Sequence, residues 1–313
     1  MVDNTNKYSL FFTNLSSTLR TNLKLQIGFF VLIWVIFSAI GVFLGRKIAA
    51  FSGVNDLDGL LSGLDQEALL EHINTLKVII IVTNLFQYLL PVLAFSFLVF
   101  KSAAFVSLSA STKPRLTAVI QGVMMVLLIY PFVSFVYYWN TYLLPPDLIS
   151  QETLDLQNLF LDMKSPIDFY LNLILLGFVA GVGEEFFFRG VLQRFFSELT
   201  KSIHLGAVLT GFAFSFMHFQ LEGFIPRFIL GVLFSYLLVY TANLWITVII
   251  HVMFNSIQVL IPYFYPDLFS NINEVKEVSP AIAIVSLLVF AVFFIIFKRN
   301  NPIEYLKELD LNQ

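Results

Sequence analysis

Residues 169–193 read FYLNLILLGFVAGVGEEFFFRGVLQ, an apolar run that carries Glu184, Glu185 and Arg189 in its second half. A helix needs about twenty mainly apolar residues to cross a bilayer, so the run predicts a membrane-spanning helix. An ionisable side chain at the bilayer centre costs roughly 2.5–3.5 kcal/mol on insertion scales, and such residues usually mark a functional site. The stretch therefore predicts both the class of fold and the place of the site.

The composition of the chain indicates that the bilayer is its solvent. Hydrophobic residues make up 58% of the 313 residues and charged residues 12%, and the mean hydropathy is +0.82. A soluble domain usually carries about 25% charged residues. Further apolar segments approach the same length as the first, so we predict an all-α polytopic membrane protein with about eight transmembrane helices. The predicted spans are 25–45, 78–100, 117–139, 169–193, 203–219, 228–242, 244–262 and 281–297.

The spans divide the chain into one membrane domain and two tails. We predict an N-terminal tail over residues 1–24, a transmembrane domain over 25–297 with its motif-bearing core at 169–262, and a C-terminal tail over 298–313. In an eight-span arrangement, twelve of the eighteen Lys and Arg residues fall on the side of the termini. The positive-inside rule then places both tails in the cytoplasm, and we expect the plasma (inner) membrane.

Composition also disfavours several kinds of function. The chain has no cysteine, which excludes disulfides, thiolate metal sites and a cysteine nucleophile. The formal net charge of −3, without a basic cluster, argues against binding of nucleic acid. The expected partners are the lipid bilayer and a membrane-bound protein or peptide.

The first polar pattern is Glu184-Glu185-Phe-Phe-Phe-Arg189. Glu185 and Arg189 are four residues apart, so on a helix they lie on one face and can form an ion pair. Glu184 is rotated from Glu185 by about 100° and can point elsewhere, where it is free to act on water. Gly181 and Gly183 precede the pair and would allow close approach of a neighbouring helix or of a substrate backbone.

Two further patterns carry imidazoles. Phe214-Ser-Phe-Met-His218 closes the fifth predicted span, and its histidine could hold the same water as Glu184 while Phe214 shields it. His251-Val-Met-Phe-Asn255 presents two hydrogen-bond donors on one face of the seventh span. Two donors directed at one point are what a tetrahedral oxyanion needs. Together the patterns predict a hydrolytic site inside the membrane.

Each pattern alone also has a purely structural interpretation. A Glu–Arg pair in a membrane helix often only joins helices, and a single membrane His or Asn is more often a satisfied contact between helices. Phe214 alone carries no information in a chain with 36 phenylalanines. The order and spacing of the three patterns, on successive helices, favour the functional interpretation.

The three patterns together resemble the signature of the CPBP family of intramembrane proteases, also called the Abi or type II CAAX prenyl endopeptidase-like family. That signature is Glu-Glu-x-x-x-Arg, then Phe-x-x-x-His, then His-x-x-x-Asn, and this chain matches it over about residues 175–260. The resemblance implies a bundle of about eight helices enclosing an intramembrane cavity. It also implies that Glu184 and His218 activate the attacking water and that His251 and Asn255 stabilise the oxyanion. Glu185 and Arg189 would support the site.

The need for a metal is open at this point. Glu184, His218 and His251 could form a His₂Glu zinc set that leaves a fourth position for water. The chain has no His-Glu-x-x-His pattern, and an asparagine beside His251 suits an oxyanion better than a metal. We therefore expect a glutamate-type enzyme with no obligatory cofactor, and keep zinc as the alternative.

The sequence leaves three functions to compare. The first is an intramembrane endopeptidase that acts on a membrane-associated protein or peptide. The second is a proton-coupled transporter, in which the glutamates and histidines relay protons; such proteins often contain paired repeats with broken helices, and none is visible here. The third is a non-catalytic peptide-binding or immunity protein, against which the intact polar set argues mildly.

Overall fold

The computed structural model describes residues 18–54, 56, 57, 59, 66–149, 151–267 and 278–301, of which 66–68 and 151–153 are described by backbone alone. In this part of the chain every regular element is a helix. Seven helical segments are long and apolar enough to cross a membrane. They are Leu23–Phe51 (α2), Ile73–Ser107, Leu116–Leu143 (α8), Pro166–Thr200, Phe224–Thr241 (α14), Leu244–Phe264 (α15) and Pro280–Asn300 (α17).

An eighth apolar helix, Ile203–Phe216 (α13), is shorter than the others. It falls within the fifth predicted span, so all eight predicted spans correspond to helices. The prediction of an all-α, multi-pass membrane protein is confirmed. α13 has 14 residues, which at about 1.5 Å per residue is shorter than the roughly 30 Å hydrocarbon core of a bilayer.

Two of the long segments are composite, because short stretches of wider or tighter helix interrupt them. Ile73–Ser107 consists of α5 (Ile73–Asn84), the π-helical η1 (Leu85–Leu89), α6 (Leu90–Phe100), the 3₁₀ turn η2 (Lys101–Ala103) and α7 (Ala104–Ser107). Pro166–Thr200 consists of α10 (Pro166–Asn172), the π-helical η4 (Leu173–Ala180), α11 (Gly181–Glu185), the π-helical η5 (Phe186–Leu192) and α12 (Gln193–Thr200). Three shorter elements are α4 (Gln66–Glu71), the 3₁₀ turn η3 (Pro146–Leu148) and α9 (Gln151–Leu161).

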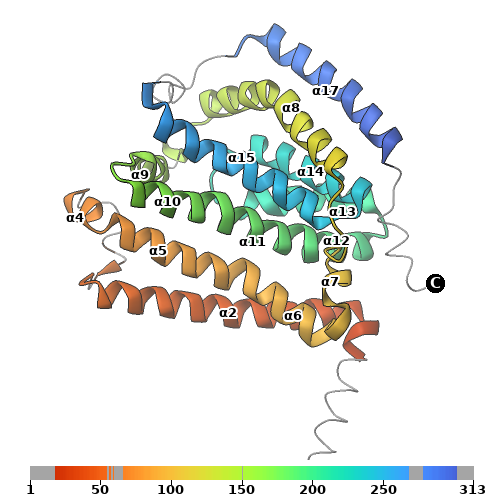
Figure 1. Cartoon of the computed structure of the whole chain (residues 1–313), viewed down its shortest axis with the longest axis horizontal. Helices are drawn as coiled ribbons and strands as arrows, with labels where there is room; N and C mark the ends of the chain where they lie inside the picture. Colours follow the sequence, from red (N-terminus) through yellow and green to blue (C-terminus); the bar gives the residue numbers. More distant parts are fainter. Residues whose placement is uncertain are drawn as a thin grey trace, which may run out of the picture.

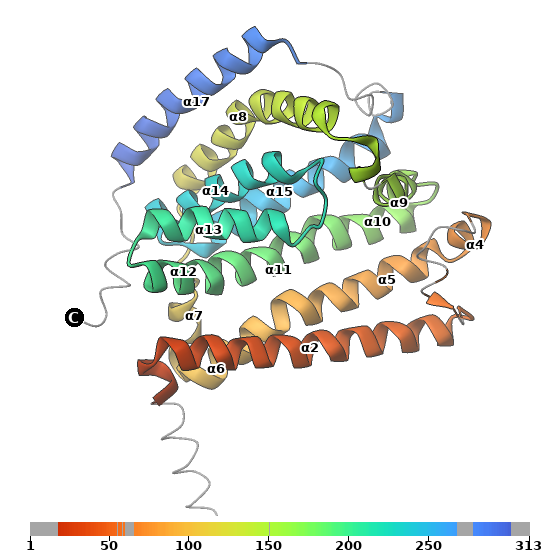
Figure 2. The same cartoon turned by 180° about the vertical axis from the view of Figure 1, so that it is seen from behind.

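The helices lie in layers around the segment that carries the two glutamates (Figures 1 and 2). α2 packs on α5 and α6 at one side, and α8 packs on α17 at the other. Between them, α11 contacts α15, α12 contacts α13, and α13 contacts α14. Burial decreases from the central helix to the outer helices. In the apolar 18-residue stretch of Pro166–Thr200, 61% of the residues are buried, against 17% in the corresponding stretches of α2 and α17. The glutamates are therefore carried by a central helix.

Aromatic packing fixes the central helix against the outer pair. Phe187 lies 5.5 Å from Phe30 between ring centroids, and Phe30 lies 5.2 Å from Phe95. These residues belong to η5, α2 and α6, and all three are buried. Phe186 and Phe188 are buried as well, so the run that follows Glu185 anchors the central helix on several sides.

The expected close approach at Gly181 is confirmed. A Cβ atom at this position would lie 2.8 Å from Cγ2 and 3.1 Å from the backbone nitrogen of Val252. α11 therefore packs directly against the backbone of α15, which brings the glutamates close to His251.

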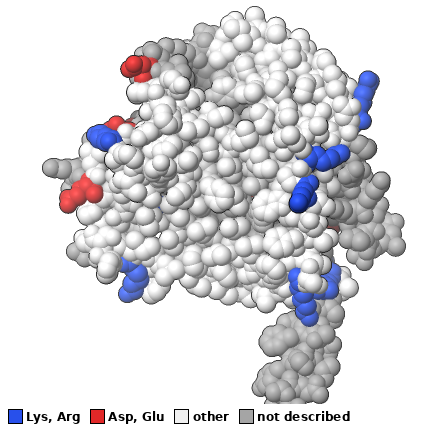
Figure 3. All heavy atoms as spheres, in the orientation of Figure 1, with Lys and Arg blue, Asp and Glu red and all other residues white. Residues whose placement is uncertain are grey.

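Charged side chains lie at the two ends of the bundle. On the face shown in Figure 3, the acidic side chains lie at one end, Lys and Arg predominate at the other, and a broad uncharged belt separates them. Such a belt is what a protein surrounded by lipid requires. The assignment of one end to the cytoplasm stays a prediction.

Two of the hollows at the surface have linings that contain none of the motif residues. One of about 380 Å³ lies beside Thr112, Lys113 and Trp245. The other, of about 270 Å³, lies between α8 and the start of α14. The cavity expected around the motif residues stays a prediction.

Candidate active site

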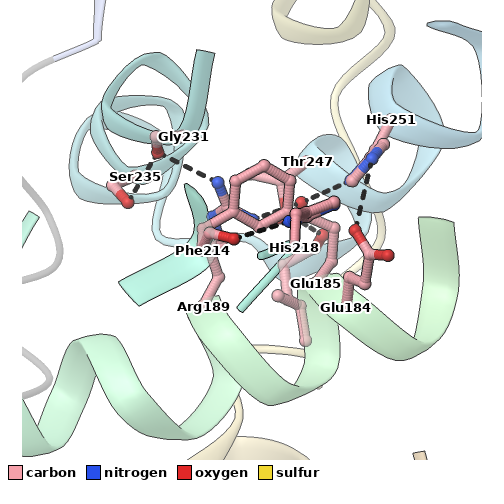
Figure 4. A network of polar contacts seen from close by, with 10 residues as sticks. Glu184, Glu185, Arg189, Phe214, His218, Gly231, Ser235, Thr247 and His251 are labelled. Atoms are coloured by element: carbon pink, nitrogen blue, oxygen red, sulfur yellow. Dashed lines mark hydrogen bonds and ion pairs between the residues drawn. The ribbon is translucent and has the colours of Figure 1, made fainter. Parts of the chain in front are cut away.

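The two adjacent glutamates point in different directions, as their spacing predicts. They end α11, a short regular segment between the π-helical η4 and η5. π-Helical turns inside α-helices occur frequently at functional sites. The Glu185 side chain is fully buried, whereas that of Glu184 is 13% exposed. Figure 4 shows both carboxylates beside His251.

Arg189 holds Glu185 in a buried ion pair. Its Nη1 lies 2.7 Å from Oε1 of Glu185, and its Nη2 donates to the carbonyl oxygen of Gly231 at 2.9 Å. The guanidinium lies over the rings of Phe214 and Phe234, 4.8 and 5.4 Å from their centroids. A fully buried charge needs both a counter-ion and hydrogen bonds. The expected Glu185–Arg189 pair is present, and it also joins η5 to α14.

His251 lies between the two glutamates (Figure 4). Its Nδ1 is 2.7 Å from Oε1 of Glu185, and its Nε2 is 3.8 Å from Oε2 of Glu184. The imidazole ring stacks on Phe234 with 5.1 Å between centroids. Because Nδ1 faces a carboxylate, it carries a proton, and the ring is oriented so that Nε2 faces Glu184. The 3.8 Å separation is too long for a direct hydrogen bond but short enough for a strong electrostatic interaction.

His218 approaches the site from the loop after α13. Its Nδ1 lies 2.7 Å from the carbonyl oxygen of Phe214, and the two rings meet edge to face. An Nδ1 that faces a carbonyl oxygen carries the proton, which leaves Nε2 as a hydrogen-bond acceptor. His218 interacts electrostatically with Glu184 and His251. The structure therefore places both histidines near Glu184.

Asn255 lies one turn beyond His251 on α15. Its Nδ2 donates to the carbonyl oxygen of Leu176 in η4 at 3.0 Å. A side-chain amide has two N–H donors, so one bond to Leu176 orients the group and leaves a second N–H. Its predicted part in an oxyanion site stays a prediction.

Other residues of the network were not identified from the sequence. Phe234 and Gly231 belong to α14 and meet the site only through tertiary packing. Ser235 donates to the carbonyl oxygen of Gly231 at 3.0 Å, which joins it to the Arg189 contact. Thr247, on α15, is also one of the residues of the network in Figure 4. Because Thr247 is four residues before His251, the face that carries His251 and Asn255 also contains it, and this spacing could have indicated it.

The alternative zinc set is not gathered into a metal-binding group. Within the described residues, no three His, Asp or Glu side chains lie close enough together to hold a metal ion. Both histidines use Nδ1 for a protein contact. The metal requirement stays a prediction.

One of the comparisons with known proteins agrees with the patterns in the chain. No curated protein and no solved structure matches the sequence. A family model does match, and it covers α10 through most of α15, the part that holds all the residues of Figure 4. Residues 166–257 match the model of the family described as type II CAAX prenyl endopeptidase Rce1-like, which confirms the family resemblance predicted from the three patterns.

Proposed function

We propose that the chain is an intramembrane endopeptidase that hydrolyses a peptide bond of a membrane-associated protein or peptide. The family match supports a peptidase. The observation that carries the proposal is the position of His251, with Nδ1 on Glu185 and Nε2 facing Glu184. A carboxylate that faces an oriented imidazole can exchange a proton with water while its charge stays balanced.

In the first step Glu184 takes a proton from water. His218 helps to hold this water through Nε2, since its Nδ1 is used by the carbonyl oxygen of Phe214. The hydroxide oxygen attacks the carbonyl carbon of the substrate, and the electron pair of the C=O double bond moves to the oxygen. A tetrahedral intermediate with one negative charge results.

The negative charge then lies where His251 can neutralise it. Before the attack, Arg189 balances Glu185 and a protonated His251 balances Glu184. After it, Glu184 is neutral and the charge has moved to the oxyanion, which accepts a hydrogen bond from Nε2 of His251. The second N–H of Asn255 supplies another donor. The cluster keeps its net charge throughout, so little reorganisation is needed in a low-dielectric site.

Collapse of the intermediate completes the reaction. The C–O double bond forms again, the C–N bond breaks, and the proton on Glu184 passes to the leaving nitrogen. The immediate products are a carboxylic acid and an amine, and Glu184 returns to its ionised state. The proton of the acid then passes to the amine, so that a carboxylate and an ammonium group leave the site. General acid–base catalysis of this kind typically contributes about 10²–10⁴-fold in rate.

A comparison of peptide termini in membranes tests this proposal. The wild type, Glu184→Gln and Glu198→Gln would be produced at equal levels in cells that lack the protein. Glu198 is the matched control, because it lies on the same long helix and pairs with Arg194 away from the network. Specific new termini should appear with the wild type and the control only. The same termini with Glu184→Gln would contradict the assigned base.

The variant Asn255→Ala tests the oxyanion part of the mechanism. Its kcat would be measured with a synthetic peptide that spans one of the cleavage sites identified by those termini. Loss of an oxyanion donor should lower kcat by about 10²–10³. If Asn255 only joins α15 to η4, its hydrogen bond is worth about 0.6 kcal/mol and kcat should stay within a few-fold.

We further propose that the reaction has no obligatory metal. Cleavage of the same peptide should persist after treatment with a strong zinc chelator. Loss of activity that returns on addition of Zn²⁺ would instead support the set of Glu184, His218 and His251.

A further inference from the structure

A second buried carboxylate lies near the reacting groups. Glu222 is in the loop between α13 and α14 and is 1% exposed, yet neither of its carboxylate oxygens has a hydrogen-bond partner among the described residues. Burial of an unsatisfied polar group costs about 1–3 kcal/mol, and more for a charge. Such a group in a folded protein therefore needs an explanation.

The surroundings of Glu222 connect it to the site. Arg227 interacts electrostatically with Glu222 and with Glu184. Its guanidinium donates to the backbone and side-chain oxygens of Gln220, which directs its hydrogen bonds away from Glu222. The charge of Arg227 compensates that of Glu222 without filling its acceptor positions.

The loop that carries Glu222 is held in place by its neighbours. Nδ2 of Asn140, on α8, lies 2.7 Å from the carbonyl oxygens of both Leu221 and Glu222. Oγ of Ser215, in α13, donates to the carbonyl oxygen of Phe224, the first residue of α14, at 2.6 Å. His218 belongs to the same loop. The unpartnered carboxylate thus lies on a fixed backbone, four residues after a histidine of the site.

A hollow adjoins this loop. It measures about 270 Å³, and Asn140 and Ile225 line it together with the side chains Phe135, Val136, Trp139, Leu143 and Leu144. Ligand pockets for whole small molecules typically measure about 300–1,000 Å³, so the hollow suits part of a ligand, such as a large apolar side chain. Leu221 and Phe219, in the adjacent loop, are 47% and 80% exposed.

We propose that this hollow and Glu222 form a substrate-binding subsite beside the reacting groups. The hollow takes a large apolar side chain of the peptide, and the carboxylate of Glu222 accepts a hydrogen bond from a main-chain N–H of the peptide. Because Glu222 is covered in the free protein, binding requires movement of the side chains that cover it. The backbone N–H groups of a peptide inside a membrane need hydrogen-bond acceptors from protein. The unpartnered carboxylate of Glu222 can supply one such acceptor. The subsite rests on the proposed endopeptidase function.

N-Methylation of a cleaved peptide tests the subsite. Each main-chain N–H of a fluorogenic peptide cleaved by the wild type would be methylated in turn. Methylation of the one N–H that binds Glu222 removes a hydrogen bond to a charged group. It should therefore raise KM about tenfold or more, and methylation at the other positions should have less effect. In Glu222→Leu the KM for the unmodified peptide should be raised to a similar extent. The same methyl group should then have no further effect.

Three additional variants sharpen the comparison. Glu222→Gln keeps the shape and should show an intermediate KM, whereas Glu198→Gln should match the wild type. At the peptide position whose side chain enters the hollow, the wild type should cleave peptides with leucine better than peptides with alanine. Ile225→Trp fills the hollow and should abolish this preference. In all of them kcat should change less than KM, because none acts in the chemical step.

The outcomes separate the two proposals. An equal methylation penalty in the wild type and in both Glu222 variants, or a lower kcat with unchanged KM, would overturn the subsite and leave the endopeptidase intact. Absence of cleavage by the wild type would overturn both.

Discussion

At the scale of single residues, the Glu185–Arg189 pair shows most directly how burial and charge determine the site. Both side chains are fully buried, and one carboxylate oxygen serves both Arg189 and His251. Removal of one partner of a buried pair leaves an uncompensated charge and typically costs about 3–5 kcal/mol, whereas replacement of both partners is often near neutral. The stability of this pair should therefore depend strongly on which partners are changed.

We predict that Arg189→Met lowers the free energy of unfolding by about 3–5 kcal/mol. The double variant Glu185→Gln with Arg189→Met should recover part of that loss, since no unpaired carboxylate remains. Unfolding of the purified proteins in detergent would measure the stability of the single and the double variant. Lys298→Met, at an exposed position, is the control. Additive losses in the double variant would show that the charge of Glu185 is compensated by other means.

The sequence allowed the residues of the site to be predicted better than their contacts. Spacing alone placed Glu185 and Arg189 on one face, because that contact lies within one helix. The contact of Arg189 with Gly231 joins residues 42 positions apart, and that of His251 with Glu185 joins residues 66 apart. No local pattern encodes such contacts. Glu222 belongs to no motif, and its burial without a hydrogen-bond partner among the described residues results from tertiary packing, which no local pattern encodes.

At the scale of elements, the contact of α13 with α14 determines where the loop with His218 lies. A Cβ atom on Gly211 would lie 2.6 Å from Cγ2 and 2.8 Å from the backbone nitrogen of Val232, and one on Gly231 would lie 2.9 Å from Cα of Gly211. The two backbones are therefore in contact, as small residues allow in membrane helices. The same Gly231 supplies the carbonyl oxygen for Arg189.

We predict that Gly211→Ala separates α13 from α14 and lowers both stability and activity. The displacement should weaken the bond from Arg189 to Gly231 and move His218. Gly28→Ala is the matched control: no atom lies within 4 Å of the added methyl group, and Ala in a helix is favoured over Gly by about 0.5–1 kcal/mol. Unfolding and peptide cleavage would be measured on both variants. Wild-type behaviour of Gly211→Ala would show that the helices tolerate separation.

The helical elements follow from apolar length, which is why all eight spans could be predicted. Their irregularities could not. The end of α13 at Phe216 and the π-helical turns around Glu184 and Glu185 result from packing of whole helices. Because α13 is short, the loop with His218 and Glu222 starts within the thickness of the bundle. Irregular backbone at membrane depth is tolerated only where protein or a cavity surrounds it, and the bonds from Asn140 to this loop fulfil that condition.

At the scale of the whole molecule, the orientation in the membrane decides from which side a peptide would reach the proposed site. The bundle has charged ends and an uncharged belt (Figure 3). The excess of Lys and Arg on the side of the termini predicts that this side is cytoplasmic. The loop with His218 and Glu222 would then lie toward the opposite face, and peptides would approach from there.

Cysteine labelling in intact cells tests this orientation. The chain has no cysteine of its own, so any label on the purified protein comes from the introduced residue. Ser52, after α2, and Ser111, before α8, are both exposed and lie on opposite sides of the eight-span arrangement. We predict that an impermeant maleimide labels Ser52→Cys in intact cells and labels Ser111→Cys only after permeabilisation. The reverse pattern would place the termini outside and the loop with His218 toward the cytoplasm, so the peptides that the site can receive would come from the other side of the membrane.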